Sequence, residues 1–248
     1  MELNFLYLAC TIPAIMLYGV AKSGLGGSMA LISIPLMTVV MTLSQALAII
    51  LPILILSDLV AVYRFRKSYD LETSKLLVIG GGIGVIIGSF TYTFFSEELL
   101  KALIGVMGFL FTTHYFIFKR KKIIPLKKSI IKGGLSSIVA GFASFCVHAG
   151  GTPTSIYLLP LRLKKEIYVG TRVIFFTSLN FIKLPFYIHL SFFNADTLKQ
   201  SLLFFPASVL GILIGYQILK RVKESVFYNV VYALILVSSA RLIFEYFF

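Results

Sequence analysis

The sequence predicts an all-α polytopic membrane protein made of two inverted repeats of five segments each, with short or re-entrant helices interrupted by Gly and Pro. Three observations lead to this class. The composition is apolar, with 58% hydrophobic residues, 13% charged residues and a mean hydropathy of +0.94. The chain divides into ten apolar segments. One glycine-rich element occurs twice, about half the sequence apart.

The apolar segments are long enough to cross a bilayer. About 20 apolar residues span the roughly 30 Å of hydrocarbon in a membrane, and several segments reach that length. They occupy nearly all of the chain, so we expect one membrane domain over residues 1–248, with these approximate segments: 3–20, 28–43, 44–63, 76–95, 99–118, 129–147, 152–161, 169–190, 198–218 and 226–247.

The basic residues predict the orientation. The net charge is +13, but Lys and Arg concentrate in short loops between apolar segments, a pattern that membrane topology explains better than nucleic-acid binding. If both termini lie outside, most of the 23 Lys and Arg fall on the inner side, and only Lys101, Lys199 and Arg241 fall near the outer side. An odd number of segments per half then inverts the second repeat, approximately 127–248, relative to the first, approximately 1–122.

The duplicated element has the same plan in both halves. The first copy runs from Lys22 to Pro35 and the second from His148 to Pro160; in each, a Gly-Gly pair precedes a proline by eight or nine residues. The Gly-x-x-x-Gly motif at 84–88 in the first half also has a counterpart at 211–215 in the second half. Short segments interrupted by Gly and Pro at matching positions indicate the binding site of a secondary transporter.

Residues 152–161 would form a helix of only about 15 Å, half of a membrane. The segment either spans a thinned bilayer or returns from a hairpin that turns at His148–Gly151. We expect two hairpins that enter from opposite faces, with their glycine turns facing each other near the membrane middle.

Those turns predict an anion site. Hydroxyl residues and proline suit the first positions of a helix, and the N–H groups at a helix N-terminus bind anions. The structural alternative to an anion site is that these glycines only allow neighbouring helices to pack closely. We expect the substrate to contact Lys22, Gly24, Gly26, Gly27, Ser28, His148, Gly150, Gly151, Thr152, Thr154, Asn180 and Lys183; Ser155 and Thr171 are further polar neighbours.

Ionisable residues inside apolar segments are costly and usually face a cavity or a partner. Asp58 is the one acidic residue well inside such a segment, and we expect it to couple transport to protons. Alternatively, it forms a static pair with Arg64 or Arg66. Lys183 could likewise extend its amine to the outer interface.

The chain resembles the TauE/SafE family of sulfite and organosulfonate exporters and permeases over nearly its whole length. The matching positions include both Gly-x-x-x-Gly elements and a glycine turn followed by a short proline-containing helix in each half: Gly24, Gly26, Gly27, Pro35, Gly150, Gly151, Pro153 and Pro160. The resemblance implies transport of a small sulfur-containing anion, such as sulfite, thiosulfate, sulfoacetate or another organosulfonate, across the plasma membrane. Ser28 replaces the family's third glycine, and His148, Ala149 and Thr152 also depart from its pattern.

Rival functions remain at this point. A channel would conduct without coupling to an ion gradient, and an accessory subunit would not transport. A membrane-embedded enzyme would need convergent acids, histidines or metal ligands, and the sequence shows no such motif. We therefore expect no enzyme activity, cofactor or metal. We expect a small anion and the lipid bilayer as partners, with protons as the coupling ion; the oligomeric state, including a homo-oligomer, stays open.

Overall fold

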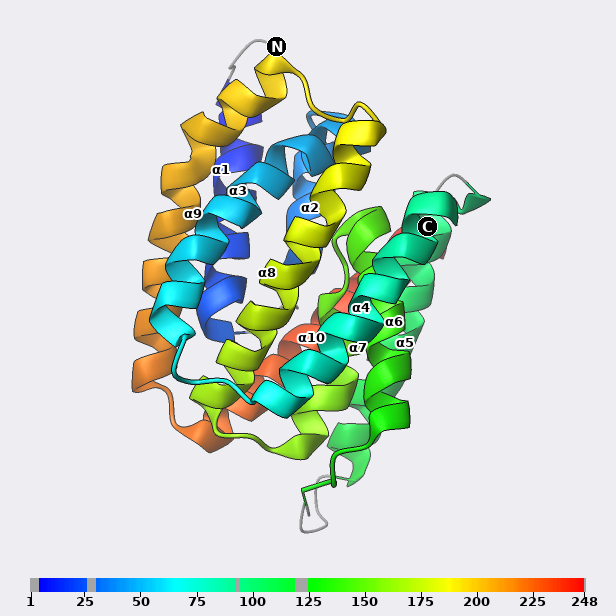
Figure 1. The fold of residues 1–248 in the computed structure, drawn as a ribbon, viewed down its shortest axis with the longest axis vertical. Coiled ribbons are helices and arrows are strands. Elements are labelled where there is room, and N and C mark those ends of the chain that lie inside the picture. The colour runs from blue at the N-terminus through cyan, green and yellow to red at the C-terminus, as the bar shows by residue number, and fades with distance from the viewer. Residues whose placement is uncertain (1–4, 26–29, 92–93, 119–124, 248) are drawn as a thin grey trace.

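The computed structural model describes residues 5–25, 30–91, 94–118 and 125–247, and it is helical in all ten regions where the sequence predicted a segment (Figure 1). The five elements of the first half are α1 Phe5–Val20 with the π-helical turn η1 Ala21–Leu25, α2 Ala30–Thr38, α3 Leu43–Phe65, α4 Leu71–Thr91 and α5 Glu97–Phe118. Those of the second are α6 Ile130–Val147, α7 Gly151–Leu158 with the 3-10 turn Leu159–Leu161, α8 Lys165–His189, α9 Ala195–Arg221 and α10 Glu224–Phe247. The all-helical class predicted from the sequence is therefore confirmed.

Seven helices in the described part of the chain are long and apolar enough to cross a membrane: α1, α3, α4, α6, α8, α9 and α10. Large apolar side chains cover their outer faces; Ile79 on α4, Leu202 on α9 and Val237 on α10 are each about two-thirds exposed. Such surfaces are stable in lipid and would not be in water.

Helices α2 and α7 are short. The prediction of an apolar segment over 28–43 was too long, since α2 ends at Thr38 and α3 already begins at Leu43. Thr42 sets this boundary because its side chain accepts from the backbone N–H of Gln45, whose side chain caps Thr42 in return. Both halves therefore contain one helix of at most nine residues.

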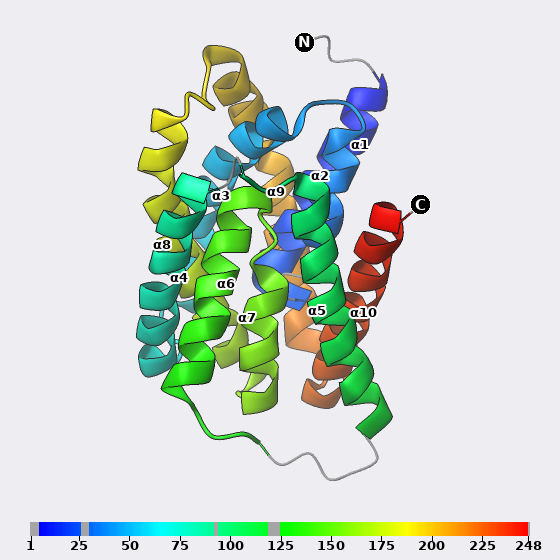
Figure 2. The same cartoon turned by 90° about the vertical axis from the view of Figure 1, so that its right-hand side faces the viewer.

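The short helices belong to two hairpins that enter from opposite ends of the bundle. Helix α1 descends from the end where the N-terminus lies, and α2 packs back against it (Figures 1 and 2). Helix α6 rises from the other end, and α7 returns along it (Figure 2). The α6–α7 turn is buried, and His148 in it has a left-handed conformation with φ 51°. Irregular backbone at this depth is tolerated because protein surrounds it.

The packing partners of the two halves correspond. Helix α1 packs on α9 as α6 packs on α4, α3 contacts α9 as α8 contacts α4, and α5 pairs with α10. Glycines bring the first two pairs close: a Cβ at Gly84 of α4 would lie 2.0 Å from the Ile138 carbonyl oxygen on α6, and one at Gly211 of α9 would lie 2.2 Å from the Met16 oxygen on α1. No side chain larger than hydrogen fits at either crossing.

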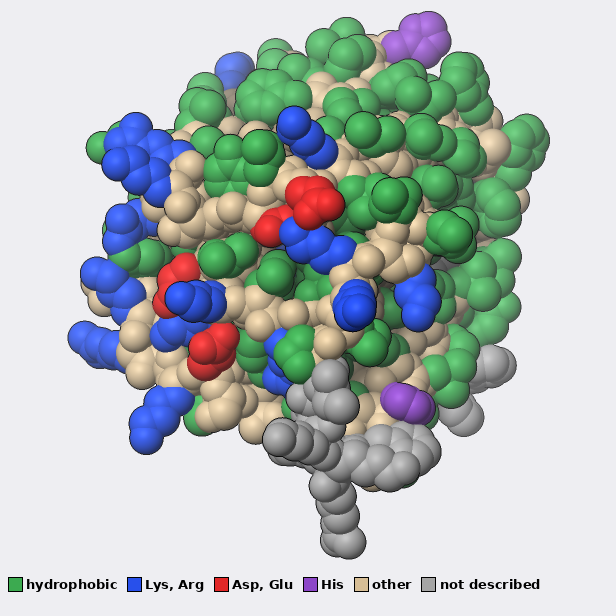
Figure 3. All heavy atoms as spheres, turned by 60° about the horizontal axis from the view of Figure 1, so that its bottom comes forward, with side chains coloured by type: hydrophobic (Ala, Val, Ile, Leu, Met, Phe, Trp, Pro, Cys, Tyr) green, Lys and Arg blue, Asp and Glu red, His purple; other side chains and the backbone are tan. Residues whose placement is uncertain are grey.

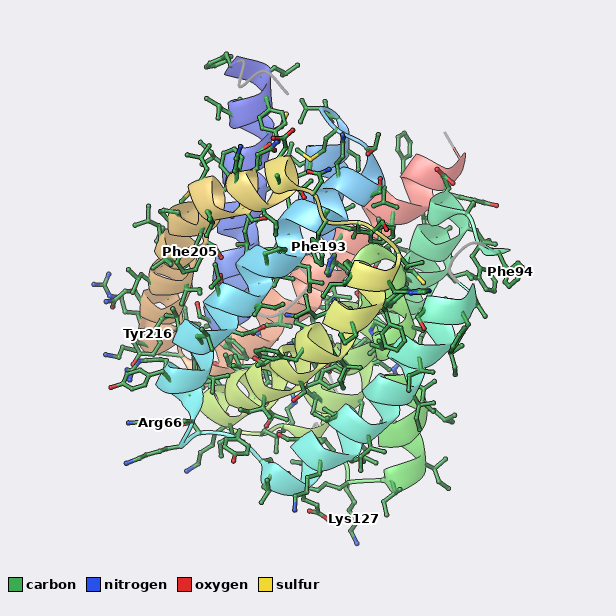
Figure 4. The ribbon with its side chains drawn as sticks, turned by 45° about the horizontal axis from the view of Figure 1, so that its top comes forward. Arg66, Phe94, Lys127, Phe193, Phe205 and Tyr216 are labelled. Atoms are coloured by element: carbon green, nitrogen blue, oxygen red, sulfur yellow. The ribbon has the colours of Figure 1, made fainter. Side chains whose placement is uncertain are left out.

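Charge separates the two ends of the molecule. Lys and Arg side chains gather on the end that Figure 3 turns toward the viewer, while hydrophobic side chains dominate the flank. Arg66 and Lys127 project from that end, and Phe94 lies away from it (Figure 4). In the same region, Lys128 bonds to Asp70 at 2.9 Å and to Glu72 at 2.8 Å. The ends thus differ in the way that the positive-inside rule describes.

Candidate anion-binding site

Both hairpins contribute to one cavity of about 70 Å³ inside the bundle. Ala21 and Lys22 reach it from η1, Ser144 and His148 from the end of α6, and Gly151 from the start of α7. Residues far apart in the sequence therefore line one space, which Tyr18, Leu54, Arg172, Val173, Phe176 and Asn180 complete.

Lys22 lies beside this cavity in an ion pair. Its Nζ is 2.7 Å from Oδ1 of Asp58 and donates to the Leu54 carbonyl oxygen at 2.6 Å. Asn180 donates from Nδ2 to the other carboxylate oxygen of Asp58 at 2.8 Å. The Asp58 side chain is fully buried, and the pairing compensates its charge, as the burial of an ion requires. One acid on α3 therefore orients two polar residues of the cavity wall.

Lys183 supports the part of the wall that Ser144 and His148 form. Its Nζ lies 3.2 Å from the Ser144 carbonyl oxygen, 3.3 Å from Ser144 Oγ and 3.1 Å from His148 Nδ1. It is fully buried and stands behind Ser144 and His148 rather than in the cavity wall itself. All three neighbours are neutral, so Lys183 differs from Lys22 in lacking a carboxylate within bonding distance among the described residues.

The contact with Lys183 determines the tautomer of His148. With Lys183 as an ammonium group, which only donates, Nδ1 accepts and the ring proton resides on Nε2. Nε2 is buried and has no hydrogen-bond partner in the described part of the chain. His148 lines the cavity. One of the residues lining the cavity therefore carries a buried N–H donor that has no partner among the described residues.

Arg172 is the site residue that sequence reasoning missed. Its Nη1 lies 2.6 Å from Ser155 Oγ, 3.2 Å from the Tyr168 hydroxyl and 3.3 Å from the Gly151 carbonyl oxygen, and its side chain is almost entirely buried. Arg172 falls within the apolar segment predicted over 169–190, and it was not among the residues expected at the site. Helical spacing could have revealed it, because positions 172, 176, 180 and 183 share one face of a helix.

The structure brings several predicted residues to the site but not all of them. Lys22, His148, Gly151 and Asn180 line the cavity, and Lys183 and Asp58 support it. Gly24 lies in η1 and Gly150 in the second turn. The predictions for Gly26, Gly27 and Ser28 fall outside the described residues.

Two predicted hydroxyl donors do not line the cavity. Thr154 Oγ1 donates to the Gly150 carbonyl oxygen at 2.7 Å, within its own helix. Thr152 is fully buried, and its methyl group lies toward Gly108 of α5. Thr171 is also absent from the wall, since its hydroxyl accepts from the backbone N–H of Asp70 at the basic end.

The two structural alternatives for the buried charges were wrong. Asp58 pairs with Lys22 and not with an arginine on its own helix: Arg64 stacks over Tyr216 at 3.9 Å, and Arg66 over Tyr63 at 4.5 Å. Lys183 does not extend to an interface, because it is fully buried. The buried charges therefore converge from different helices around one cavity.

Two hairpins that contribute to one cavity, inside a bundle of membrane-length helices, are an arrangement typical of membrane transport proteins. The comparison with known families agrees. Residues 11–242 match the family described as "Sulfite exporter TauE/SafE", so the chain belongs to this family. No curated protein and no solved structure matches the chain.

Proposed function

We propose that this protein is a secondary transporter that carries a small sulfur-containing anion through the cavity between its two hairpins. Membership of the sulfite exporter family supports the class of cargo. Within that class we propose sulfite, thiosulfate, sulfoacetate or another organosulfonate as the substrate.

The observation that carries the proposal is the set of fixed donors around the cavity. Lys22 and Arg172 bring charged donors, and His148 brings an unsatisfied N–H. Three guanidinium contacts of Arg172 use Nη1, while Nη2 and Nε have no hydrogen-bond partner among the described residues. Donors held rigidly in a buried space bind oxyanions strongly, particularly where they are charged.

Transport requires access from both sides in turn, and the fold supports such a cycle. The hairpins enter from opposite ends, and their packing partners correspond between the halves. These features support two inverted repeats, in which rocking one set of helices against the other would expose the cavity alternately. The concentration of basic residues at one end supports an orientation in the plasma membrane with that end inside and both termini outside.

Asp58 is the proposed coupling residue. Protonation would neutralise its carboxylate and release Lys22 from the ion pair, which changes the charge beside the cavity. A proton gradient would thereby influence anion binding. This role predicts that Asp58→Asn abolishes the acceleration of flux by a pH gradient but preserves anion exchange at equal pH. Identical pH-driven flux in the wild type and the variant would exclude it.

The experiment that tests transport uses purified full-length protein in liposomes loaded with labelled sulfite, thiosulfate or sulfoacetate. We expect saturable flux and accelerated exchange when unlabelled anion is present on the opposite side. Conductance without accelerated exchange would favour a channel, and no flux of any of these anions would overturn the proposal.

Arg172→Gln gives a matched test of the site. It should reduce flux at least about tenfold, since a buried charged hydrogen bond contributes about 1.5–3 kcal/mol. Arg66→Gln removes an arginine that lies over Tyr63 at the molecular surface instead. This control should transport as the wild type does.

A further inference from the structure

We infer that the cavity selects oxyanions with two negative charges over those with one. This inference rests on the proposed function and concerns the charge of the substrate that the site accepts. It follows from the charges buried around the cavity.

Three cations and one carboxylate are buried at the site. Lys22, Lys183 and Arg172 are each at least nine-tenths buried, and Asp58 is the one buried acidic side chain in the portion of the chain whose side chains are described. Lys22 and Asp58 neutralise each other at 2.7 Å. Lys183 and Arg172 remain, and they give the empty site a net charge of +2.

The hydrogen bonds support these ionisation states. Lys183 Nζ has three acceptors within 3.3 Å, one for each proton of an ammonium group. Lys22 is held against a carboxylate and a carbonyl oxygen. Arginine stays protonated in proteins. With Lys183 as an ammonium group, His148 Nδ1 accepts its proton and the imidazole is neutral.

An anion with two charges restores neutrality, whereas a monovalent anion leaves one buried charge without compensation. A zwitterion, such as an aminosulfonate, compensates none of the net charge. Buried charges are stable only when they are paired. The site should therefore bind divalent anions more tightly than monovalent anions. Lys183 contributes through its charge and through the His148 tautomer, so it is a positioning residue and not a direct ligand.

Thiosulfate and methanesulfonate provide a test matched in shape. Each has an SO₃ group and one further substituent on a tetrahedral sulfur, a terminal sulfur in thiosulfate and a methyl group in methanesulfonate. Thiosulfate carries two charges and methanesulfonate one. Calorimetry on the detergent-solubilised full chain near neutral pH should show thiosulfate binding at least about tenfold more tightly.

Substitution of Lys183 sharpens the test. Lys183→Met removes one charge and should reduce the ratio of the two affinities at least about tenfold, mainly by weakening thiosulfate binding. Lys183→Arg retains the charge and should preserve the preference for thiosulfate. If Lys183→Met does not fold, as judged by size-exclusion chromatography, Arg172→Gln removes the other unneutralised charge and should reduce the ratio likewise.

The outcomes separate this inference from the proposed function. Equal affinities in the wild type, or tighter binding of methanesulfonate, would overturn the preference while leaving anion binding in place. If a folded variant that lacks one of these charges keeps the wild-type ratio of thiosulfate to methanesulfonate affinity, the net charge of +2 is not the cause of the preference. Failure of both anions, and of sulfite, to bind would refute the proposed function itself.

Discussion

The two hairpins are built on the same plan, but they carry their charge differently. Lys22, on the first hairpin, faces Asp58 at 2.7 Å. Lys183, beside the second hairpin, contacts only neutral groups of Ser144 and His148. The first lysine is therefore part of a neutral pair, and the second is available to attract an anion. The two hairpins therefore adjoin one lysine whose charge is neutralised and one whose charge has no counterion among the described residues.

This contrast corrects the simplest interpretation of the sequence. Lys22 adjoins the first glycine turn and would be expected to supply the main substrate charge. The ion pair with Asp58 offsets that charge, whereas Arg172 and Lys183 have no such partner among the described residues. The net attraction for an anion therefore comes from α8, which contributes both of these cations.

The largest expected effect tests the neutral pair. Asp58→Asn leaves Lys22 buried without its counterion and should reduce the free energy of unfolding by about 3–5 kcal/mol. Thermal unfolding in detergent measures the loss. The double variant Lys22→Met/Asp58→Asn should recover most of the stability, because Lys22 then no longer leaves a buried charge without its counterion. If the double variant is no more stable than Asp58→Asn, the two side chains do not act as a pair.

A smaller effect tests whether the two halves pack alike. Gly84→Ala and Gly211→Ala each place a Cβ within 2.2 Å of a carbonyl oxygen on the neighbouring helix. Each should destabilise the protein by about 1–3 kcal/mol, the usual cost of overpacking. Gly134→Ala on α6 is the control, since no atom lies within 4 Å of its added Cβ, and a gain of up to about 1 kcal/mol from helix propensity is expected. If only one of the two variants is destabilised, the two helix crossings are not equivalent.

The smallest effect concerns the segment between the halves, where Lys128 bonds to Asp70. Burial tends to raise the pKa of Asp70, but hydrogen bonds from Thr73 and Lys128 outweigh it and lower the pKa overall. The ionised carboxylate therefore stabilises the folded protein above its unfolded pKa of about 3.9, and that contribution disappears as the pH falls through the lower folded pKa.

Asp70→Asn removes this charge but keeps a side-chain oxygen that can accept from the Thr73 N–H. It should lower stability at neutral pH by at most about 1 kcal/mol, because the pair is solvent-exposed. In thermal melts the difference from the wild type should begin to shrink near pH 4 and should vanish only once the pH is below the lowered folded pKa of Asp70. A difference that is unchanged across that range would contradict the electrostatic explanation.

Much of the architecture was determined by sequence pattern. The apolar lengths predicted ten helical regions, and the glycine and proline spacing indicated where the two interrupted elements lie. The glycine turns and the polar residues inside apolar segments predicted Lys22, His148, Asn180 and Lys183 as site residues, and the structure places them in or beside the cavity. Periodicity and residue type suffice for these conclusions because burial in lipid leaves few alternatives to a helix.

Only the tertiary structure decided how the charges pair. Asp58 and Arg64 are neighbours on one helix, yet Asp58 meets Lys22 and Asn180, which lie 36 and 122 positions away in the chain. Arg172 lies inside the predicted apolar segment 169–190 and was not expected at the site, but the rotation of α8 turns it into the cavity. An ion pair depends on distances of a few ångströms between helices, and those distances follow from packing at glycines such as Gly84 and Gly211 and not from the spacing of charges along the chain.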